Sequence, residues 1–421
     1  MTVAAGSARR SPSPRSGGQG SMSTSHWVVI GGGIAGTSCA YFLAADGHQV
    51  TLLERAGLCS GTTSACQNNV GVPLGAGDAT AYYQAAYAVY EELRAAGFDL
   101  GFVRHGHLYV ARDEMVAEAL LGSLEQAQRS GMRAYSIPPQ EYRAVEPRLA
   151  HDIEAAVFLP GGAQVSPMQV VFDLARAASR LGARIVTGAE VHGISVVSGR
   201  ARSVETTRGR FEADGIVIAA GAWSRRVGEL AGLSIPVFPR RGQVLVTESA
   251  PGWLSRGIID YGFDVALMEG NAGTSQGSVI GTVVQPLPSG NILIGGSVED
   301  AGYDRGLDRP ILAEMARLAL ACVPDIGSLR VIRAYAGLRP STPDGWPIVG
   351  PCSGVAGLML ATGHGGAGID GGPLAGRLVA DLVAGRPPVI DPGPVSPDRF
   401  GPSLHAGHAS AAGSTRAGEA R

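Results

Sequence analysis

The sequence contains no lysine, and all 34 of its basic residues are arginines. This absence excludes catalysis through a lysine Schiff base and a phosphate-binding loop that depends on a lysine. Genomic base composition is an ordinary source of such usage. The net charge is −2, so no nucleic acid or other polyanion is expected as a partner.

Cysteines and long apolar runs are also scarce. The five cysteines are odd in number and include no Cys-x-x-Cys pair, so neither a disulfide framework nor a metal site is indicated. A reducing, cytoplasmic location is expected. No apolar run reaches the roughly 18 residues that span a bilayer. The first 21 residues lack the apolar core of a secretory signal.

The length of 421 residues predicts two domains. Glycine is abundant, with 62 residues, which is typical of tight turns and of ligand surfaces lined by backbone. Residues 1–24 and 393–421 are rich in small residues and proline. We expect both ends to be disordered tails.

A glycine-rich turn follows the first apolar run. Residues 27–30 lead into Gly31-Gly32-Gly33-Ile34-Ala35-Gly36, which opens a helical pattern. Eighteen residues after Gly36, Glu54 closes a second apolar run at 50–53. A strand, a glycine turn, a helix, a strand and an acid in this order predict a site for the ADP half of a dinucleotide, and therefore redox chemistry.

Each residue type of this segment has a physical role in such a site. Gly31 permits the tight turn, Gly33 lets a pyrophosphate approach the backbone, and Gly36 lets the helix pack closely. The helix N-terminus attracts the phosphates. Glu54 can accept hydrogen bonds from both ribose hydroxyls and would repel a 2′-phosphate, so FAD or NAD is favoured over NADP. The remaining residues predicted to bind the cofactor here are Ile34, Ala35 and Arg55.

The rest of the chain reads as an α/β protein with an α+β second domain. Helices are predicted at 78–97, 114–131, 136–149, 166–181, 310–321 and 372–384, and strands at 102–111, 184–187, 190–198, 201–207, 215–221 and 358–362. The region 235–294 reads as an antiparallel sheet. A discontinuous, Rossmann-like cofactor domain is predicted at 25–95, 160–232 and 333–392, and a substrate domain with an antiparallel sheet at 96–159 and 233–332.

Six segments together resemble the D-amino-acid-oxidase superfamily of flavoenzymes, which includes glycine oxidase, the sarcosine oxidases and small D-amino-acid dehydrogenases. They cover the chain from about 27 to 390 and read VVIGGGIAG with Glu54, TTSACQNN, GIVIAAGAWS, RRGQVLVTE, IRAYAGLRPSTPDGWPIVGP and GHGGAGIDGGPLAGRLVADL. The segment QPLPSGNILIGGSVEDAGYD is similar to the flavin subunits of heteromeric dehydrogenases that act on hydroxyproline, opines or glycine. That group often has GHEGHG in the C-terminal turn, whereas this chain has GHGGAG.

The resemblance implies an FAD-dependent oxidoreductase. Such an enzyme oxidises the C–N bond of a small amino acid or secondary amine by hydride transfer to flavin N5, and the resulting imine hydrolyses. The electron acceptor would be O2, a quinone or another electron-transfer partner. The absence of lysine removes one device that activates oxygen and so favours a dehydrogenase.

Two other functions stay open at this point. The chain could be the flavin subunit of a heteromeric dehydrogenase that passes electrons to an iron–sulfur partner. It could also be an FAD monooxygenase, although those enzymes usually have Gly-Asp in the C-terminal flavin turn, where this chain has Gly363-His364-Gly365.

Two residues are predicted to be catalytic. Arg339 offers a planar fork of donors for a substrate carboxylate, and the resemblance to glycine oxidase implies this role; a structural pairing with Asp344 is the alternative. His364 could contact flavin or substrate, or be structural. The backbone N–H groups of the same turn are expected to face the flavin O2, and they belong to Gly365, Gly366, Ala367, Gly368 and Ile369.

The remaining cofactor contacts also follow from the resemblance. Thr62, Thr63 and Ser64 have hydroxyls suited to the pyrophosphate and the flavin edge, with an ordinary polar loop as the alternative. Val191 is expected to contact adenine through its backbone. Ala220 and Gly221 should line the ADP pocket through their backbone.

Overall fold

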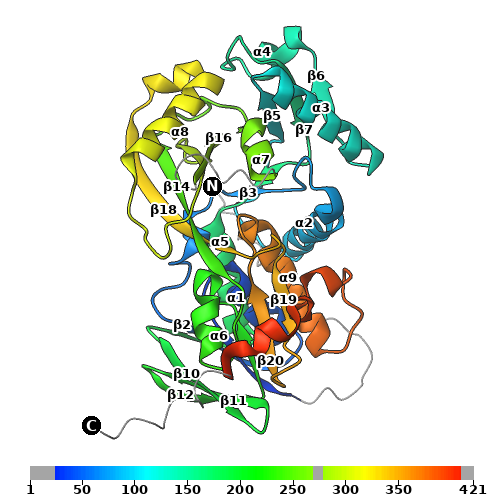
Figure 1. The fold of residues 1–421 in the computed structure, drawn as a ribbon, viewed down its shortest axis with the longest axis vertical. Helices are drawn as coiled ribbons and strands as arrows, with labels where there is room; N and C mark the ends of the chain where they lie inside the picture. Colours follow the sequence, from blue (N-terminus) through cyan, green and yellow to red (C-terminus); the bar gives the residue numbers. More distant parts are fainter. Residues whose placement is uncertain (1–23, 269–277, 409–421) are drawn as a thin grey trace, which may run out of the picture.

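The computed structural model describes residues 24–268 and 278–408. These residues form two lobes stacked along the longest axis of the molecule (Figure 1). The lower lobe contains a six-stranded, mostly parallel sheet, and the upper lobe contains an eight-stranded, mostly antiparallel sheet. The predicted α/β class, with a second domain built on an antiparallel sheet, is confirmed.

The six-stranded sheet has the strand order β19-β20-β13-β1-β2-β9. All neighbouring strands are parallel except β19 and β20. The strands are near-continuous apolar runs, as expected when both faces of a parallel sheet are covered. Their bounds are β1 (His26–Ile30), β2 (Gln49–Glu54), β9 (Arg184–Thr187), β13 (Gly215–Ile218), β19 (Ile348–Pro351) and β20 (Leu358–Thr362).

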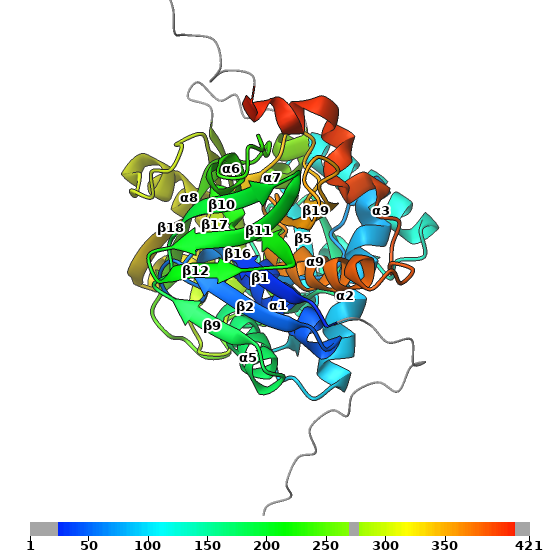
Figure 2. The ribbon, with the colours of Figure 1, turned by 90° about the horizontal axis from the view of Figure 1, so that it is seen from below.

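Alternate side chains of this sheet face two different layers. Val29, Leu52 and Val217 pack against helices, and Val28 and Ile216 pack against a small antiparallel sheet (Figure 2). The helices are α1 (Ile34–Ala45), α2 (Thr80–Ala95), α5 (Pro167–Arg180) and α9 (Gly368–Val383). The small sheet consists of β10 (Val191–Val197), β11 (Arg200–Thr206) and β12 (Gly209–Glu212), and α6 (Ser224–Glu229) follows β13.

The eight-stranded sheet has the order β18-β14-β17-β16-β15-β5-β7-β6, and only the pair β15 and β5 is parallel. One face packs on Ala319 and Cys322 of α8, and the other on Leu120 and Leu124 of α3. The elements are β5 (His107–Ala111), α3 (Glu114–Arg129), β6 (Tyr135–Ile137), α4 (Tyr142–Val145), β7 (Ala155–Leu159), β14 (Phe238–Thr247), β15 (Gly257–Asp260), α7 (Tyr261–Met268), β16 (Ser278–Pro286), β17 (Ile292–Glu299), α8 (Arg309–Cys322) and β18 (Val331–Ser341).

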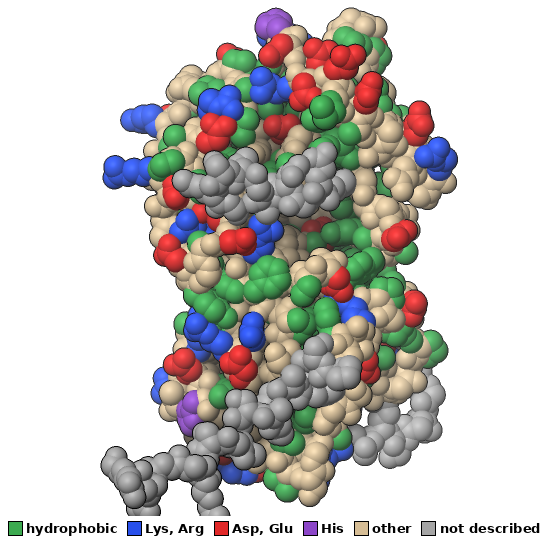
Figure 3. Space-filling model, viewed as in Figure 1, with side chains coloured by type: hydrophobic (Ala, Val, Ile, Leu, Met, Phe, Trp, Pro, Cys, Tyr) green, Lys and Arg blue, Asp and Glu red, His purple; other side chains and the backbone are tan. Residues whose placement is uncertain are grey.

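Short elements connect the two lobes. β3 (Asn69–Val70), β8 (Ala163–Gln164) and β4 (Val103–Arg104) form a three-stranded sheet. The loop after β2 contains a turn of 3₁₀-helix, η1 (Thr62–Ala65). On the face shown in Figure 3, arginine and acidic side chains are interspersed. Within the described ranges, no helix combines the length and the apolarity needed to cross a membrane.

The structure differs from the predicted elements at several places, among them the strand predicted at 102–111, which is divided into β4 and β5. The region 235–294 also contains helix α7, which was not predicted because the region as a whole is rich in β-branched residues. The helix predicted at 136–149, ending at Pro147, is shorter than expected and consists of a 3₁₀ turn, η3 (Pro139–Glu141), followed directly by α4. α9 begins at Gly368 rather than at 372. β18 pairs with β14, so it belongs to the eight-stranded sheet and not, as the predicted boundary at 333 implied, to the cofactor domain.

The predicted C-terminal tail is partly folded. Residues 393–408 contain the 3₁₀-helices η6 (Gly393–Val395) and η7 (Pro397–His408), and η7 is kinked at Gly401. Val395 and Leu404 are buried in the two cores of the lower lobe. The prediction of disorder from 393 onward was therefore wrong for this stretch, because two apolar residues anchor it. The rest of both predicted tails, 1–23 and 409–421, lies outside the described residues.

Candidate functional site

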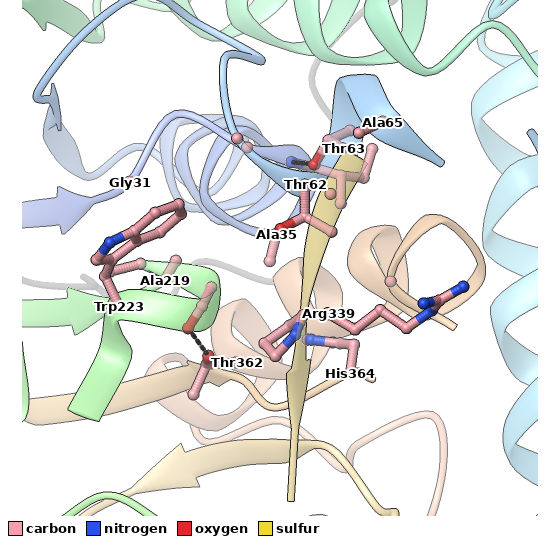
Figure 4. A pocket seen from close by; sticks show the side chains of 18 of the residues that line it. Gly31, Ala35, Thr62, Thr63, Ala65, Ala219, Trp223, Arg339, Thr362 and His364 are labelled. Carbon is pink, nitrogen blue, oxygen red and sulfur yellow. Dashed lines mark hydrogen bonds between the residues drawn. The ribbon is translucent and has the colours of Figure 1, made fainter. Parts of the chain in front are cut away.

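A cavity of about 730 Å³ lies at the carboxyl ends of β1, β2 and β13, facing the eight-stranded sheet. This is the switch point of the parallel sheet, since β1 connects to β2 on one side and has β13 on the other. Ligands of open α/β sheets bind at such points. Figure 4 shows the glycine turn and the loop after β2 on one side of the cavity, and Arg339 and His364 on another.

The glycine turn depends on close backbone contacts. Gly31 has φ of +116°, and a Cβ at this residue would lie 2.3 Å from the carbonyl oxygen of Ala219. A Cβ on Gly36 would lie 1.8 Å from the carbonyl oxygen of Gly31. Gly36 does not line the cavity but allows α1 to begin tightly against the turn. The other predicted residues of the turn do line it, namely Gly31, Gly33, Ile34 and Ala35.

The acid at the end of β2 holds the turn through its carboxylate. Glu54 Oε2 accepts from the backbone N–H of Gly32 at 2.7 Å, and Oε1 accepts from that of Ala56 at 2.9 Å. The guanidinium of Arg55 lies 4.0 Å from the ring centroid of Trp223. These side chains form one end of the cavity, together with Val191, Ala220 and Gly221.

The loop after β2 brings two of its three predicted hydroxyls to the cavity. Thr63 Oγ1 accepts from the backbone N–H of Ile34 at 3.2 Å, and Thr62 Oγ1 donates to the carbonyl of Leu338. Both residues line the cavity. Ser64 is exposed and donates to the carbonyl of Gly61 at 3.1 Å. The structure therefore does not bring Ser64 to the site, because the 3₁₀ turn points its side chain outward.

The turn before α9 presents fewer free donors than predicted. The N–H of Gly365 donates to the carbonyl of Pro340 at 2.8 Å, and that of Ala367 donates to the carbonyl of His364 at 2.9 Å. Ala367 also does not line the cavity. Among the described residues, the N–H groups of Gly366, Gly368 and Ile369 have no partner. These three residues line the cavity at the N-terminus of α9, as does Gly365.

Arg339 lies in β18 at the cavity wall. Its Nη1 donates to the carbonyl of Ser297 at 2.7 Å, while Nε and Nη2 make no hydrogen bond within the part of the chain that the structure describes. Burial lowers the pKa of Arg339 to about 10, so the side chain stays charged at neutral pH. Asp344 pairs with Arg399 instead, so the alternative of an Arg339–Asp344 pair is not what the structure has.

His364 lines the cavity and is buried. Its Nε2 has no hydrogen-bond partner among the described residues. Burial lowers the pKa of His364 to about 4, so the imidazole is neutral at pH 7. The ring packs against Gly371, where a Cβ would lie 3.1 Å from His364 Cδ2 and 2.0 Å from Tyr82 Oη.

The sequence analysis missed several residues of the cavity wall. Asp370 follows the predicted turn residues directly, and Trp223 ends the GIVIAAGAW segment, so both had a weak positional signal. The apolar residues of the upper wall had none, because they come from the eight-stranded sheet and from α7. The missed residues include Asn69, Trp223, Arg226, Val244, Phe263, Val298 and Asp370.

The cavity fits FAD by its own chemistry. One end has a glycine turn in which a Cβ on Gly31 would overlap the backbone of Ala219, with an acid beside it. The other end has unpartnered backbone donors at a helix N-terminus. The two ends belong to one continuous cavity, as an extended dinucleotide requires.

Comparisons with known proteins agree with this geometry. The family model described as FAD dependent oxidoreductase, DAO, matches residues 26–382. A glycine oxidase from Geobacillus kaustophilus is 31% identical over 379 residues, which cover 88% of this chain and 95% of the relative. The crystal structure of a glycine oxidase from that organism has a TM-score of 0.77 at 29% identity and covers 89% of this chain and 98% of that one.

A third relative has a different name. The hydrogen cyanide synthase subunit HcnC of Pseudomonas aeruginosa is 28% identical over 419 residues, which cover 89% of this chain and 96% of the relative. Since the family model spans most of the described residues and the cavity fits the cofactor of that family, this chain belongs to the DAO family of FAD-dependent oxidoreductases.

Proposed function

We propose that the protein oxidises the C–N bond of a small amino acid or secondary amine that carries a carboxylate. The observation that carries the proposal is the guanidinium of Arg339, which is surrounded by protein and has two donor nitrogens free at the cavity wall. A planar fork of this kind matches a carboxylate. The resemblance to glycine oxidases supports the same substrate class.

Different residues of the cavity would bind the substrate, exclude water and donate or accept hydrogen bonds. Arg339 would bind and orient the carboxylate, and Val244, Phe263 and Val298 would exclude water from the reacting carbon. His364 is neutral, so it would serve as a hydrogen-bonding group rather than as a cation. Bound FAD supplies the oxidation, since its flavin accepts a hydrogen with its electron pair from the carbon next to nitrogen.

The cofactor contacts that we propose follow the cavity. The glycine turn and Thr63 would hold the pyrophosphate, and Glu54 the adenosine ribose. The adenine end would contact Arg55, Val191, Ala220 and Gly221, and Thr62 the flavin edge. The N–H groups of Gly366, Gly368 and Ile369 would stabilise negative charge at the flavin O2.

The electron acceptor is O2 or a second protein. The HcnC relative is a subunit by its name, and this favours a second candidate, in which the chain is the flavin subunit of a heteromeric amino-acid dehydrogenase. A quinone or an iron–sulfur partner would then take the electrons.

One experiment tests the substrate class and separates the acceptors. The purified protein is loaded with FAD and mixed anaerobically with a panel of amino acids, N-methylated amino acids and the matching amines without a carboxylate. We expect the yellow flavin absorbance to bleach only with carboxylated substrates. Air should then restore the absorbance and produce peroxide if the protein is an oxidase, whereas a slow response to air and a fast response to a dye would favour the dehydrogenase. Bleaching by none of the panel would contradict the proposal.

A further inference from the structure

Asp370 is a carboxylate on the cavity wall that the proposed function does not use. It lies in the first turn of α9 and lines the cavity. Its Oδ1 accepts from the backbone N–H of Gly71 at 3.0 Å, which fixes the side chain. Its own backbone N–H contributes a second hydrogen bond, and no ion pair with an arginine or histidine is found for it within residues 24–268 and 278–408.

The groups whose pKa Asp370 raises are all neutral at pH 7. They are Cys66 from the loop after β2, three tyrosines of α2, and one tyrosine of β5, namely Tyr82, Tyr83, Tyr90 and Tyr109. Burial raises the pKa of Asp370 to about 7, partly offset by its hydrogen bond from Gly71. A carboxylate held among protein groups without a cation is unfavourable unless a ligand supplies one.

Arg339 and Asp370 lie near the same thiol. Burial raises the pKa of Cys66 to about 11; beyond that effect, Asp370 raises this pKa and Arg339 lowers it. A cation and an anion thus line one cavity with Cys66 within electrostatic reach of both. An α-amino acid has the complementary arrangement, with a carboxylate and an ammonium group on one carbon.

From this arrangement we propose that Asp370 binds the ammonium group of an α-amino acid whose carboxylate is bound by Arg339. The inference rests on the proposed function and adds a residue that distinguishes amino acids from simple carboxylic acids. Asn69 stands beside this position on the cavity wall, and its buried Oδ1 has no partner among the described residues. Once bound, the ammonium would supply the cation that Asp370 lacks.

The proposal predicts a pH dependence of binding with a defined sign. Asp370 loses its proton near pH 7, while the ammonium group of an amino acid stays charged well above that pH. Affinity for an amino acid should therefore rise between about pH 6 and about pH 8. The affinity for the same acid without the amine should not rise.

The test measures binding without turnover. Glycine and acetate differ only in the ammonium group, and both are small enough to enter the cavity. They are titrated calorimetrically into the FAD-loaded protein after anaerobic reduction with dithionite, because reduced flavin cannot oxidise glycine. Asp370→Asn is compared with Asp264→Asn, which removes another carboxyl whose pKa burial raises to about 7 but which does not line the cavity.

We expect Asp370→Asn to weaken glycine binding about tenfold or more and to leave acetate binding within about twofold. Asp264→Asn should change neither. Equal losses for both ligands, or no loss for glycine, would overturn the inference while leaving the proposed function intact. Wild-type protein that binds neither ligand would overturn the inference, whereas the proposed function is decided separately by the bleaching panel. If Asp370→Asn does not retain FAD, the inference is tested on the wild-type protein alone. A ratio of glycine affinity to acetate affinity that stays constant from about pH 6 to about pH 8 would then overturn the inference.

Discussion

Arg339→Ala should weaken binding of carboxylated substrates about a hundredfold while FAD stays bound. Nη1 of Arg339 is engaged with Ser297, which leaves Nε and Nη2 for the substrate. Truncating one side of a buried, hydrogen-bonded charge pair costs about 2–5 kcal/mol. At about 1.4 kcal/mol for each factor of ten, a loss of about 2.8 kcal/mol, which lies within that range, is about a hundredfold.

The assay is steady-state kinetics on the best carboxylated substrate of the panel, with the flavin content measured by absorbance. The loss should fall mainly on KM, because the carboxylate is bound equally before and during the reaction. Arg333→Ala is the matched control, since Arg333 lies in the same strand but is exposed. It should leave both constants within about twofold.

An amine that lacks the carboxylate gives a second control. It has nothing to offer Arg339, so its KM should change little in Arg339→Ala. Unchanged kinetics with carboxylated substrates would refute the assignment of Arg339. An equal loss for both kinds of substrate would show instead that the side chain supports the cavity, for example through its bond to the Ser297 carbonyl.

Three further predictions follow from single contacts. Gly36→Ala should lower the melting temperature by several degrees and impair FAD uptake, because its Cβ would lie 1.8 Å from a carbonyl oxygen; a stable, yellow variant in a thermal melt would contradict this. Glu54→Ala should raise the Kd of the apoprotein for FAD about tenfold or more, since it removes the partner of two backbone N–H groups; a fluorescence titration that gives the wild-type Kd would count against it. Burial raises the pKa of Asp264 to about 7, so the folded state holds this proton more tightly than the unfolded chain. Wild-type protein should therefore gain stability relative to Asp264→Asn as the pH falls from about 7 to about 4. A difference in the free energy of unfolding by urea, between wild type and variant, that is the same at both pH values would disprove it.

The cofactor turn was predictable because its constraints are local. The strand, the glycines and the acid of residues 27–54 lie within one supersecondary unit, and Gly31 and Gly36 each lie close to a backbone carbonyl that leaves no room for a Cβ. The same holds for most helices and strands of the lower lobe. Among the predicted cofactor residues, Gly36, Ser64 and Ala367 do not reach the cavity. Which side chains of a short turn point into the cavity depends on packing against residues that are distant in the sequence.

The substrate side was less predictable because its wall is assembled from distant strands. Arg339 stood out by its type and by resemblance, whereas Phe263 lies in a helix that the sequence pattern did not indicate. Asp370 was missed for a related reason. The helix was expected to begin at 372, which left residue 370 outside it, although Asp370 is the third residue of α9 and lines the cavity.

β18 fixes the position of one side of the cavity relative to the other. Arg339 stands between Leu338 and Pro340, whose carbonyls are both bound to the cofactor side of the cavity. The Leu338 carbonyl accepts from Thr62 of the loop after β2, and the Pro340 carbonyl accepts from the N–H of Gly365 at 2.8 Å. One strand of the upper sheet is therefore pinned to two separate loops of the lower lobe, on either side of the residue proposed to bind substrate. Because these two hydrogen bonds to the backbone of β18 set this spacing, the position of Arg339 should withstand changes in the other side chains around it far better than loss of the Thr62 hydroxyl.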